Sequence, residues 1–483
     1  MRVRHCGASL KVLALTGAGG GAGATSLRGN PVKKNVLALS IASAFSLLAA
    51  NQAHGAAFAL AEQGASGLGN AFAGAAAAAE DASTVWWNPA GMARLPRGKH
   101  VLFAGHLIVP STKFSNNGST PGAASNPARN GNGGDASEAA FVPNLFFAMD
   151  LNPTWSFGLG INVPFGLKTE YDSDWIGRFQ GIEAEVQTLN INPAVSFKLS
   201  DRASLGFGIS YQRAKIDLLS AVNYSGVAAG ADPSLTLLGA IGGPGVEGTN
   251  STSVDGDAWG FNVGALFDVT PATRVGIHYR SSLAYETTGS TSFTNVPAAF
   301  AGVPALAART QNGDVRFDLD TPASLSFSAA HKASDQLELL ADVTWTQWSK
   351  IKQLPLIRTN GAGNGSTLDT LTFNFDDAWR VALGVNYKWT GPWTLRAGVA
   401  YDQSPVPNAE SRTVRLPDND RYWLSLGATY RASPASRFDV GYTFIHVKDA
   451  DINNDQTAVA RGIVKGTYEG RVNILSVQYQ HSF

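Results

Sequence analysis

The chain has 483 residues, with 37 basic and 37 acidic side chains, 52 glycines and a single cysteine. The six basic residues before position 56 precede the first acidic residue, Glu62, so the remainder has 31 basic and 37 acidic side chains and a net charge of about −6. This charge argues against a nucleic-acid binder. Cys6 is the only thiol, so the chain beyond the first 55 residues has no disulfide or thiolate metal site. With 44% hydrophobic and 15% charged residues, the chain is too polar for a helical membrane bundle and less charged than a typical soluble domain.

The first 55 residues predict export. Lys33 and Lys34 precede an apolar stretch at 35–50, and small residues follow around Gly55. This order is typical of a signal peptide, with cleavage expected after Gly55 or the next residue. The apolar stretch is marginal for a membrane-spanning helix. We therefore assign 1–55 to a leader that is removed. Residues 1–30 are either part of an extended signal peptide or the result of a start codon placed too early. The alternative to a signal peptide is a buried N-terminal helix.

Apolar and polar side chains alternate through most of the chain after residue 98. Between Trp379 and Trp389 every second residue is apolar and the residues between are mainly polar or small, and 204–212 repeats the pattern. Such a period predicts strands with two different faces. Fourteen segments qualify: 100–109, 141–151, 155–165, 186–199, 203–217, 256–269, 273–287, 315–331, 337–348, 378–388, 394–402, 421–431, 437–447 and 469–483.

The connections between these segments alternate strictly in length. Tight turns at 152–154, 200–202, 270–272, 332–336, 390–393 and 432–436 are separated by long stretches rich in glycine and asparagine, at 110–140, 166–185, 218–255, 288–314, 349–377, 403–420 and 448–468. Outer-membrane barrels have short periplasmic turns and longer extracellular loops. The sequence therefore predicts an all-β membrane protein, a 14-stranded antiparallel outer-membrane β-barrel.

A soluble sandwich or propeller would show the same alternation, because its strands also have one apolar face. Two further features, together with the signal peptide, favour the barrel. The chain ends at Phe483 on an alternating strand, which resembles the sorting signal of outer-membrane barrels. Aromatic residues also recur toward strand ends, as interface girdles do: Trp379, Trp389, Tyr401, Tyr422, Tyr442, Tyr468 and Tyr479.

The stretch before the first strand does not alternate. It is rich in small residues, and 75–82 has the composition of a short helix. A fourteen-stranded barrel has a lumen wide enough to be filled or to conduct water. We therefore predict that 56–97 forms an N-terminal lumenal plug, called the hatch below, and that 98–483 forms the barrel.

Eight short motifs stand out in the chain after the leader. They are Leu-Ala-Glu-Gln at 60–63, Ser-Gly-Leu-Gly at 66–69, Ala-Phe-Ala-Gly at 71–74, Asp-Ala-Ser-Thr at 81–84, Asn-Pro-Ala at 88–90, Pro-Phe-Gly-Leu-Lys-Thr-Glu-Tyr at 164–171, Ser-Pro-Val-Pro at 404–407 and Pro-Asp-Asn-Asp-Arg-Tyr-Trp-Leu-Ser at 417–425. Together they resemble the FadL/OmpP1/TodX family of outer-membrane transporters for long-chain fatty acids and hydrocarbons. The resemblance runs from about Ala56 to Phe483.

The resemblance implies two functional elements. The first is a gating hatch that contains Asn88, Pro89 and Ala90. The second is an inward kink of the third strand, which maps to Pro164, Phe165 and Gly166 and opens a lateral gap in the wall. The residue types agree with a kink, because proline cannot donate to a strand ladder and glycine permits a bend. The alternative is that these three residues simply end a strand at the rim.

The ligand class stays open between fatty acids and uncharged hydrocarbons. The stretches 214–219 and 352–355 lack a cation where the resemblance places one, and Arg213 and Lys215 are imperfect substitutes. Two loops are unusually apolar for exposed segments, which indicates either a capture groove or packing over the barrel mouth. The candidate capture residues are Leu235, Leu238, Phe300 and Leu306.

The sequence gives little support for an enzyme or a metal-binding protein. No Gly-x-Ser-x-Gly motif is present, and the histidines show neither triad nor metal-ligand spacing. We expect no enzyme activity, no cofactor and no metal. The sequence predicts passive, ligand-gated uptake of hydrophobic molecules, most readily long-chain fatty acids, across a Gram-negative outer membrane; a general porin is a weaker alternative. The expected partners are the hydrophobic ligand, outer-membrane lipid and lipopolysaccharide, and the barrel-assembly machinery, with no nucleic acid.

Overall fold

The alternating segments form strands in the computed structural model, which describes residues 56–231 and 239–483. The predicted leader, 1–55, lies outside the described residues. The strands are β1 (Lys99–Asn116), β2 (Ala140–Asp150), β3 (Trp155–Asn162), β4 (Gly166–Glu170), β5 (Glu183–Lys198), β6 (Ala203–Asn223), β7 (Glu247–Asp268), β8 (Thr273–Arg280), β9 (Leu283–Phe293), β10 (Gly313–Thr321), β11 (Ser324–Lys332), β12 (Leu337–Thr346), β13 (Gln353–Arg358), β14 (Thr367–Thr372), β15 (Ala378–Lys388), β16 (Trp393–Asp402), β17 (Arg421–Arg431), β18 (Ser436–Asp455) and β19 (Ile463–Ser482).

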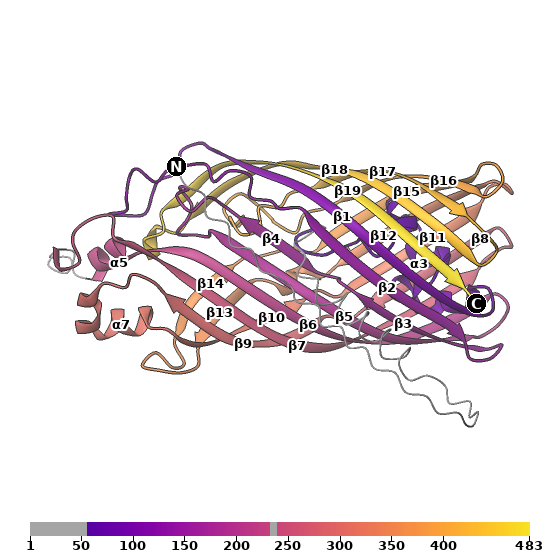
Figure 1. The fold of residues 1–483 in the computed structure, drawn as a ribbon, viewed down its shortest axis with the longest axis horizontal. Coiled ribbons are helices and arrows are strands. Elements are labelled where there is room, and N and C mark those ends of the chain that lie inside the picture. The colour runs from indigo at the N-terminus through magenta and orange to yellow at the C-terminus, as the bar shows by residue number, and fades with distance from the viewer. Residues whose placement is uncertain (1–55, 232–238) are drawn as a thin grey trace, which may run out of the picture. The chain divides into compact units, whose positions relative to one another are not determined.

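These strands form one closed antiparallel barrel. Strands in neighbouring positions of the wall are hydrogen-bonded to each other, and β1 pairs with β19 to close the ring. The two lie side by side in Figure 1. At five positions of the wall, two short strands that follow each other in the chain take the place of one long strand. They are β3 and β4, β8 and β9, β10 and β11, β12 and β13, and β14 and β15. The wall therefore has fourteen positions, which confirms the predicted barrel.

The structure differs from the expected segments where strands are interrupted. The segment predicted at 273–287 is split into β8 and β9, and the segment at 315–331 is split at Pro322, which cannot donate to a ladder. The expected long loop at 349–377 contains the β13–β14 hairpin. The helix expected at 75–82 is only the four-residue α3 (Ala75–Ala78), which ends where Ala79 adopts a positive φ of 48°.

The outer face of the barrel is apolar. Phe207, Leu383 and Leu424 are 44–58% exposed, with no protein packed over them. Aromatic side chains pair across neighbouring strands toward the strand ends, for example Trp393 with Tyr430 at 4.8 Å between ring centroids. This arrangement matches a lipid-facing band with interface girdles. Tyr468 is an exception to the expected girdle, because it is buried and its hydroxyl is hydrogen-bonded to that of Tyr171.

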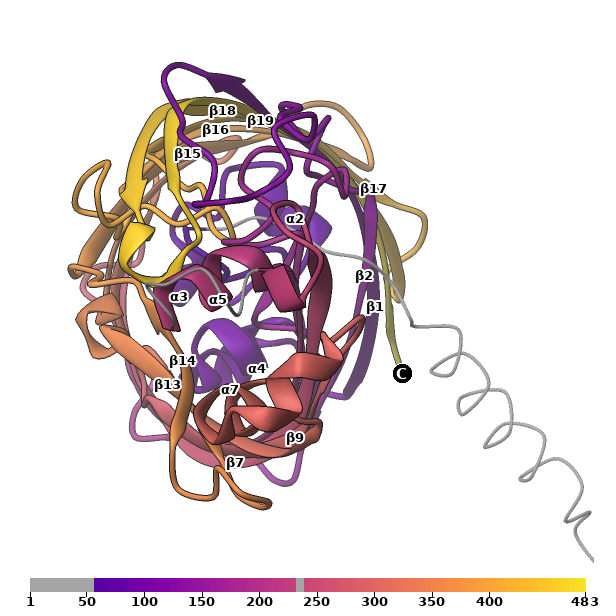
Figure 2. The ribbon, with the colours of Figure 1, turned by 90° about the vertical axis from the view of Figure 1, so that its left-hand side faces the viewer.

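The hatch lies inside the ring of strands. Its short helices are α2 (Ala65–Leu68), α3, α4 (Thr84–Trp87) and η1 (Pro89–Arg94), and Figure 2 shows α2, α3 and α4 within the barrel outline. Small residues make the close contact possible, because a Cβ at Gly206, Gly264 or Gly276 would lie within 2.1 Å of a hatch atom. Among the described residues, no helix is long and apolar enough to cross a membrane.

Gly206→Val tests this close approach. A Cβ there would lie 2.1 Å from the backbone nitrogen of Ala90 and 2.4 Å from the carbonyl carbon of Pro89, so backbone must move. We expect the substitution to destabilise the docked hatch by about 1–3 kcal/mol, as overpacking does in protein cores. The measurement is the rate of proteolysis of residues 56–97, which should increase. Gly302→Val is the control, because nothing lies within 4 Å of that position. Unchanged hatch proteolysis in Gly206→Val would contradict the packing described here.

Candidate functional site

The barrel wall is incomplete beside the third strand. Strand β3 ends at Asn162, and β2 pairs with it only from Leu145 to Asp150. Residues 140–144 of β2 therefore have no strand partner on that side within the described chain. After the kink, β4 pairs with β5 alone. The predicted kink residues thus lie at a break between β2 and β4.

The start of the hatch pairs with the kink from inside the barrel. The Leu60 amide donates to the Pro164 carbonyl at 2.8 Å, and the Gly166 amide donates to the Phe58 carbonyl at 2.9 Å. These two bonds flank an antiparallel bridge between Ala59 and Phe165. Two backbone groups of the kink, the Pro164 carbonyl and the Gly166 amide, therefore find their partners in a short piece of the hatch. We call residues 58–60 the gap segment.

Phe58 connects the gap segment to the lumen. Its ring lies 5.7 Å from that of Phe165 and 5.0 Å from that of Trp348. Both neighbours belong to a buried apolar cluster that extends across the lumen from β4 to the connection before β17. This lumenal cluster includes Phe58, Phe165, Leu167, Ile216, Phe317, Trp348, Leu354, Phe375, Val406 and Leu416.

Asn88 anchors the middle of the hatch. It is fully buried, and its Nδ2 donates to the carbonyl oxygens of Ala76 in the hatch and Ala265 in β7, at 2.7 and 3.1 Å. Its Oδ1 accepts from the Ala90 amide at 3.1 Å. Pro89 and Ala90 are also buried, at the start of η1. The Asn-Pro-Ala stretch thus ties α3, η1 and the wall together.

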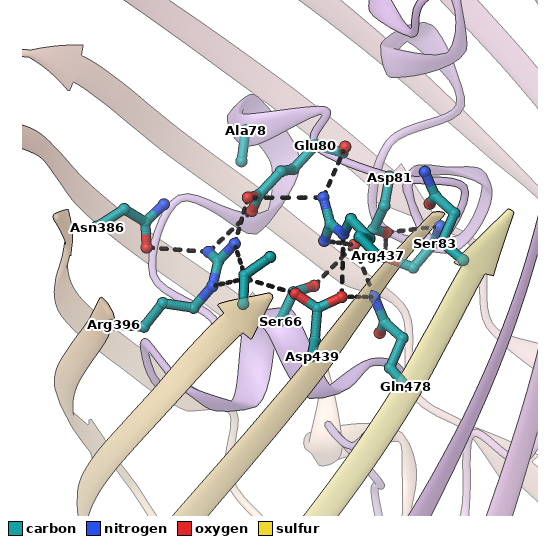
Figure 3. Close-up of polar contacts among 12 residues, drawn as sticks. Ser66, Ala78, Glu80, Asp81, Ser83, Asn386, Arg396, Arg437, Asp439 and Gln478 are labelled. Atoms are coloured by element: carbon teal, nitrogen blue, oxygen red, sulfur yellow. Dashed lines mark hydrogen bonds and ion pairs between the residues drawn. The ribbon is translucent and has the colours of Figure 1, made fainter. Parts of the chain in front are cut away.

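Ionic contacts anchor the other side of the hatch, as Figure 3 shows. Arg396 of β16 donates to both carboxylate oxygens of Glu80, with Nη1 at 2.9 Å from Oε2. Arg437 of β18 places Nη2 2.9 Å from Asp81 Oδ2 and is itself held by Asp439 at 3.0 Å. The side chains of Arg396 and Arg437 are almost completely buried. We call these residues the hatch clamp; their spacing in the sequence gave no indication of it.

The structure describes two of the four predicted capture residues, Phe300 and Leu306. Phe300, in η2 (Ala298–Gly302), and Leu306, in α7 (Pro304–Thr310), are buried together with Tyr224 and Ala228 of α5 (Tyr224–Ala231). They form a small apolar cluster of extracellular connections. Leu235 and Leu238 lie outside the described residues. The cluster brings two separate loops together.

The two imperfect substitute cations, Arg213 and Lys215, are both exposed, and a different arginine lies in the lumen. Arg213 pairs with Asp255 at 2.6 Å and is 65% exposed, and Lys215 pairs with Asp217. Arg421, at the start of β17, is 3% exposed and pairs with Asp418 at 2.6 Å. The alternation of β17 places Arg421 on the face opposite the exposed Tyr422 and Leu424, which is the lumenal face.

These features define a class of protein. A closed β-barrel with an apolar outer face, a docked plug and a break in its wall has the architecture of an outer-membrane transport barrel. Residues 46–483 match the family described as outer membrane protein transport protein (OMPP1/FadL/TodX). The chain belongs to this family, which confirms the resemblance in its sequence and its place in the outer membrane.

Individual relatives agree. The long-chain fatty acid transport protein of Shigella flexneri is 31% identical over 93% of this chain and 98% of its own. Outer membrane protein P1 of Haemophilus influenzae is 30% identical, covering 90% and 97%. The crystal structure of a Pseudomonas aeruginosa FadL homologue has a TM-score of 0.79 and 27% identity over 89% of this chain and all of its own. The Ralstonia pickettii toluene transporter TbuX, at 19% identity over 87% and 98% of the two chains, shares the fold with a TM-score of 0.61.

The clamp has a testable pH dependence. Burial alone would raise the pKa of Glu80, but the neighbouring charges of Arg396 and Arg437 outweigh it and lower the pKa from 4.5 to about 2. A carboxylate with a lowered pKa stabilises the docked state above its ordinary pKa, and this contribution is lost as the pH falls toward 2.

We therefore expect Glu80→Gln to lower the thermal stability of the docked hatch at pH 7 and to differ progressively less from the parent protein between pH 4.5 and 2. Melting temperatures of both proteins across this range measure the difference. Glu469→Gln, at an exposed position of β19, controls for loss of a carboxylate elsewhere. A difference that stays constant with pH would contradict the ionic role of Glu80.

Proposed function

We propose that the protein is a passive, ligand-gated channel that takes up long-chain fatty acids and releases them sideways into the membrane at the kink. The break in the wall between β2 and β4, occupied by the gap segment, carries this proposal. A ligand that displaces the gap segment gains a path from the lumen to the lipid phase. No energy source is needed for such a route, because accumulation depends on later trapping.

The lumenal cluster supports an apolar cargo. A hydrocarbon chain gains roughly 0.8 kcal/mol for each CH₂ that leaves water. The cluster extends this apolar environment from the extracellular half of the barrel to Phe165 at the kink. A ligand leaving beside Phe165 enters lipid without crossing the periplasm. The buried loop cluster around Phe300 and Leu306 is our candidate for first capture, with Leu235 and Leu238 as further candidates on the same connections.

Two ligand classes compete. The relatives at 30–31% identity include long-chain fatty acid transport proteins that match 93% of this chain, which favours a fatty acid. The toluene transporters share only the fold at 18–20% identity, so a hydrocarbon ligand is the alternative. Contacts with lipopolysaccharide and with the barrel-assembly machinery follow from the location of the barrel.

Asn88, Pro89 and Ala90 form the gating hatch in this proposal by fixing the plug on the wall while the gap segment moves. Asn88→Ala removes the bonds to Ala76 and Ala265. We expect looser docking and increased leakage of ligand. Leakage equal to that of the parent protein would reduce the motif to a turn.

Uptake by a Gram-negative strain that lacks its own transporter of this family tests the cargo. Cells expressing this chain are offered oleate and toluene separately. Oleate uptake alone supports the fatty-acid channel, and toluene uptake alone supports the alternative. Uptake of neither, with the barrel folded in the outer membrane, would overturn the proposed function.

A reversible disulfide tests the lateral route. Ala59 and Phe165 form a non-hydrogen-bonded antiparallel pair, and such pairs have Cα atoms about 4.5 Å apart, which a disulfide can bridge. We expect Ala59→Cys combined with Phe165→Cys to block oleate uptake when oxidised and to restore it on reduction.

Each single cysteine variant is the control for loss of the original side chain, and both should transport under either condition. The sole native cysteine, Cys6, lies in the predicted leader. Full oleate uptake by the oxidised double variant would show that ligand leaves by another path.

A further inference from the structure

We propose that the outer face of the barrel binds a lipopolysaccharide molecule by its phosphate groups, at a site on β1, β18 and β19. The inference goes beyond the proposed function and does not depend on it. The observation behind it is a group of three exposed cationic side chains on these strands, Lys113, Lys448 and Arg471. We call these residues the outer cation cluster. The three strands lie side by side, as Figure 1 shows.

The register of the strands places Arg471 at the level of the membrane interface. Directly opposite it lie Ser111 of β1 and His446 of β18. The same row continues through Tyr422 of β17 to Tyr401 of β16. The rings of Tyr422 and His446 are nearly parallel, with 6.4 Å between their centroids. Rows of tyrosine mark the headgroup level of a membrane protein, so Arg471 lies at that level.

The wall between this row and the tight turns is apolar. Phe444 of β18, Val109 of β1 and Leu475 of β19 are exposed there, and the residues that alternate with them face the lumen. The long loops lie on the other side of the row, which is the extracellular side of an outer-membrane barrel. The outer cation cluster therefore lies where the lipid-facing band meets the extracellular part of the wall, as the headgroup of an outer-leaflet lipid does.

The three cations lie close to one another on the outward face. Lys113 lies opposite Glu469, two residues before Arg471, so Lys113 and Arg471 are diagonal neighbours. Diagonal neighbours on antiparallel strands are about 7–8 Å apart, which long side chains can span. Lys448 follows His446 by two residues, at a point where the register between β18 and β19 shifts. A phosphate group at this point can therefore contact more than one cation.

The outer cation cluster has no anionic partner of its own. Within the described residues, none of the three side chains forms an ion pair or a hydrogen bond. Exposed cations on β6 and β10 do have partners: Arg213 pairs with Asp255 at 2.6 Å, Lys215 with Asp217 at 2.8 Å and Arg316 with Asp318 at 3.5 Å. The charge on those strands is thus neutralised within the protein, whereas the charge of the cluster is left for an external anion.

Two acidic side chains, Glu469 and Asp449, are exposed beside the cluster. Glu469 lies at the level of Lys113, on the loop side of Arg471. The residues directly opposite Arg471, by contrast, are Ser111 and His446, neither of which is acidic. The cation nearest to the lipid-facing band therefore has no carboxylate in either cross-strand position.

Lipopolysaccharide fits this arrangement better than a protein partner does. Its lipid carries phosphate groups at the interface and acyl chains below them, which matches a cationic row above an apolar wall. A guanidinium binds phosphate in bidentate fashion, and lysine binds it as a point charge. Lysine is depleted in protein–protein interfaces. A surface whose three cations include two lysines is therefore a poor interface between copies of this chain.

A charge-matched pair of triple variants tests the site in the full-length protein purified from the outer membrane in detergent. The first combines Lys113→Gln, Lys448→Gln and Arg471→Gln. The control combines Arg213→Gln, Lys215→Gln and Arg316→Gln, which removes three exposed cations that have partners. We expect the first variant to retain roughly 10-fold less added lipopolysaccharide, by native mass spectrometry, and the control to retain as much as the parent protein.

Equal retention by the first variant and the parent protein, or equal loss in both variants, would overturn the site. So would a parent dimer that the first variant abolishes without loss of lipopolysaccharide, because the cluster would then be an interface between two copies of the chain.

A second probe needs no substitution. Enzymatically dephosphorylated lipopolysaccharide keeps its acyl chains but loses the groups that the cluster should bind. We expect the parent protein to retain it roughly 10-fold less than the intact lipid. Equal retention of the two lipids by the parent protein would show that the acyl chains alone account for binding, and would overturn the proposal.

Discussion

The structure depends on the requirement that backbone groups facing lipid find partners within the protein. Hydrocarbon offers no hydrogen bonds, so membrane-spanning sheets close into barrels without free edges. This barrel closes at β1 and β19 but breaks between β2 and β4. The gap segment supplies the missing bonds at the Pro164 carbonyl and the Gly166 amide. The plug is therefore also a piece of the wall, and under the proposed function its removal must be offset by the ligand that takes its place.

The amount to be offset is modest. Two backbone hydrogen bonds contribute about 0.5–1.5 kcal/mol each, and burying one phenylalanine contributes about 1.5–3 kcal/mol. A chain of sixteen or more carbons entering the lumen gains more than this by leaving water. The rest of the hatch is held far more firmly, by Asn88 on β7 and by the clamp on β16 and β18. The energetics thus favour movement of the gap segment over movement of the whole plug.

Periodicity predicted the wall well because each wall strand has lipid on one face. Strands β15 and β17 have the bounds that the alternation indicated. The interruptions before β9 and β11 and the β13–β14 hairpin were missed, since those short strands are specified by their partners and not by alternation. The same limit applies to the site. The kink was visible in Pro164 and Gly166, but its pairing with residues more than a hundred positions earlier was not.

The wall just below the kink is lined by buried amide side chains instead of apolar ones, and this difference bears on the direction in which a ligand would leave. Asn162 donates to Gln63 of the hatch at 2.6 Å, and Asn190 donates to Asn162 at 2.7 Å. Asn144 donates to the Glu62 carbonyl at 2.6 Å. A hydrocarbon chain moving past these buried amides would separate them from their partners, at about 1–3 kcal/mol for each group left unsatisfied. The same chain moving sideways meets lipid. Under the proposed function, the lumenal cluster above and the amides below therefore leave the break in the wall as the path of lowest cost for an apolar ligand.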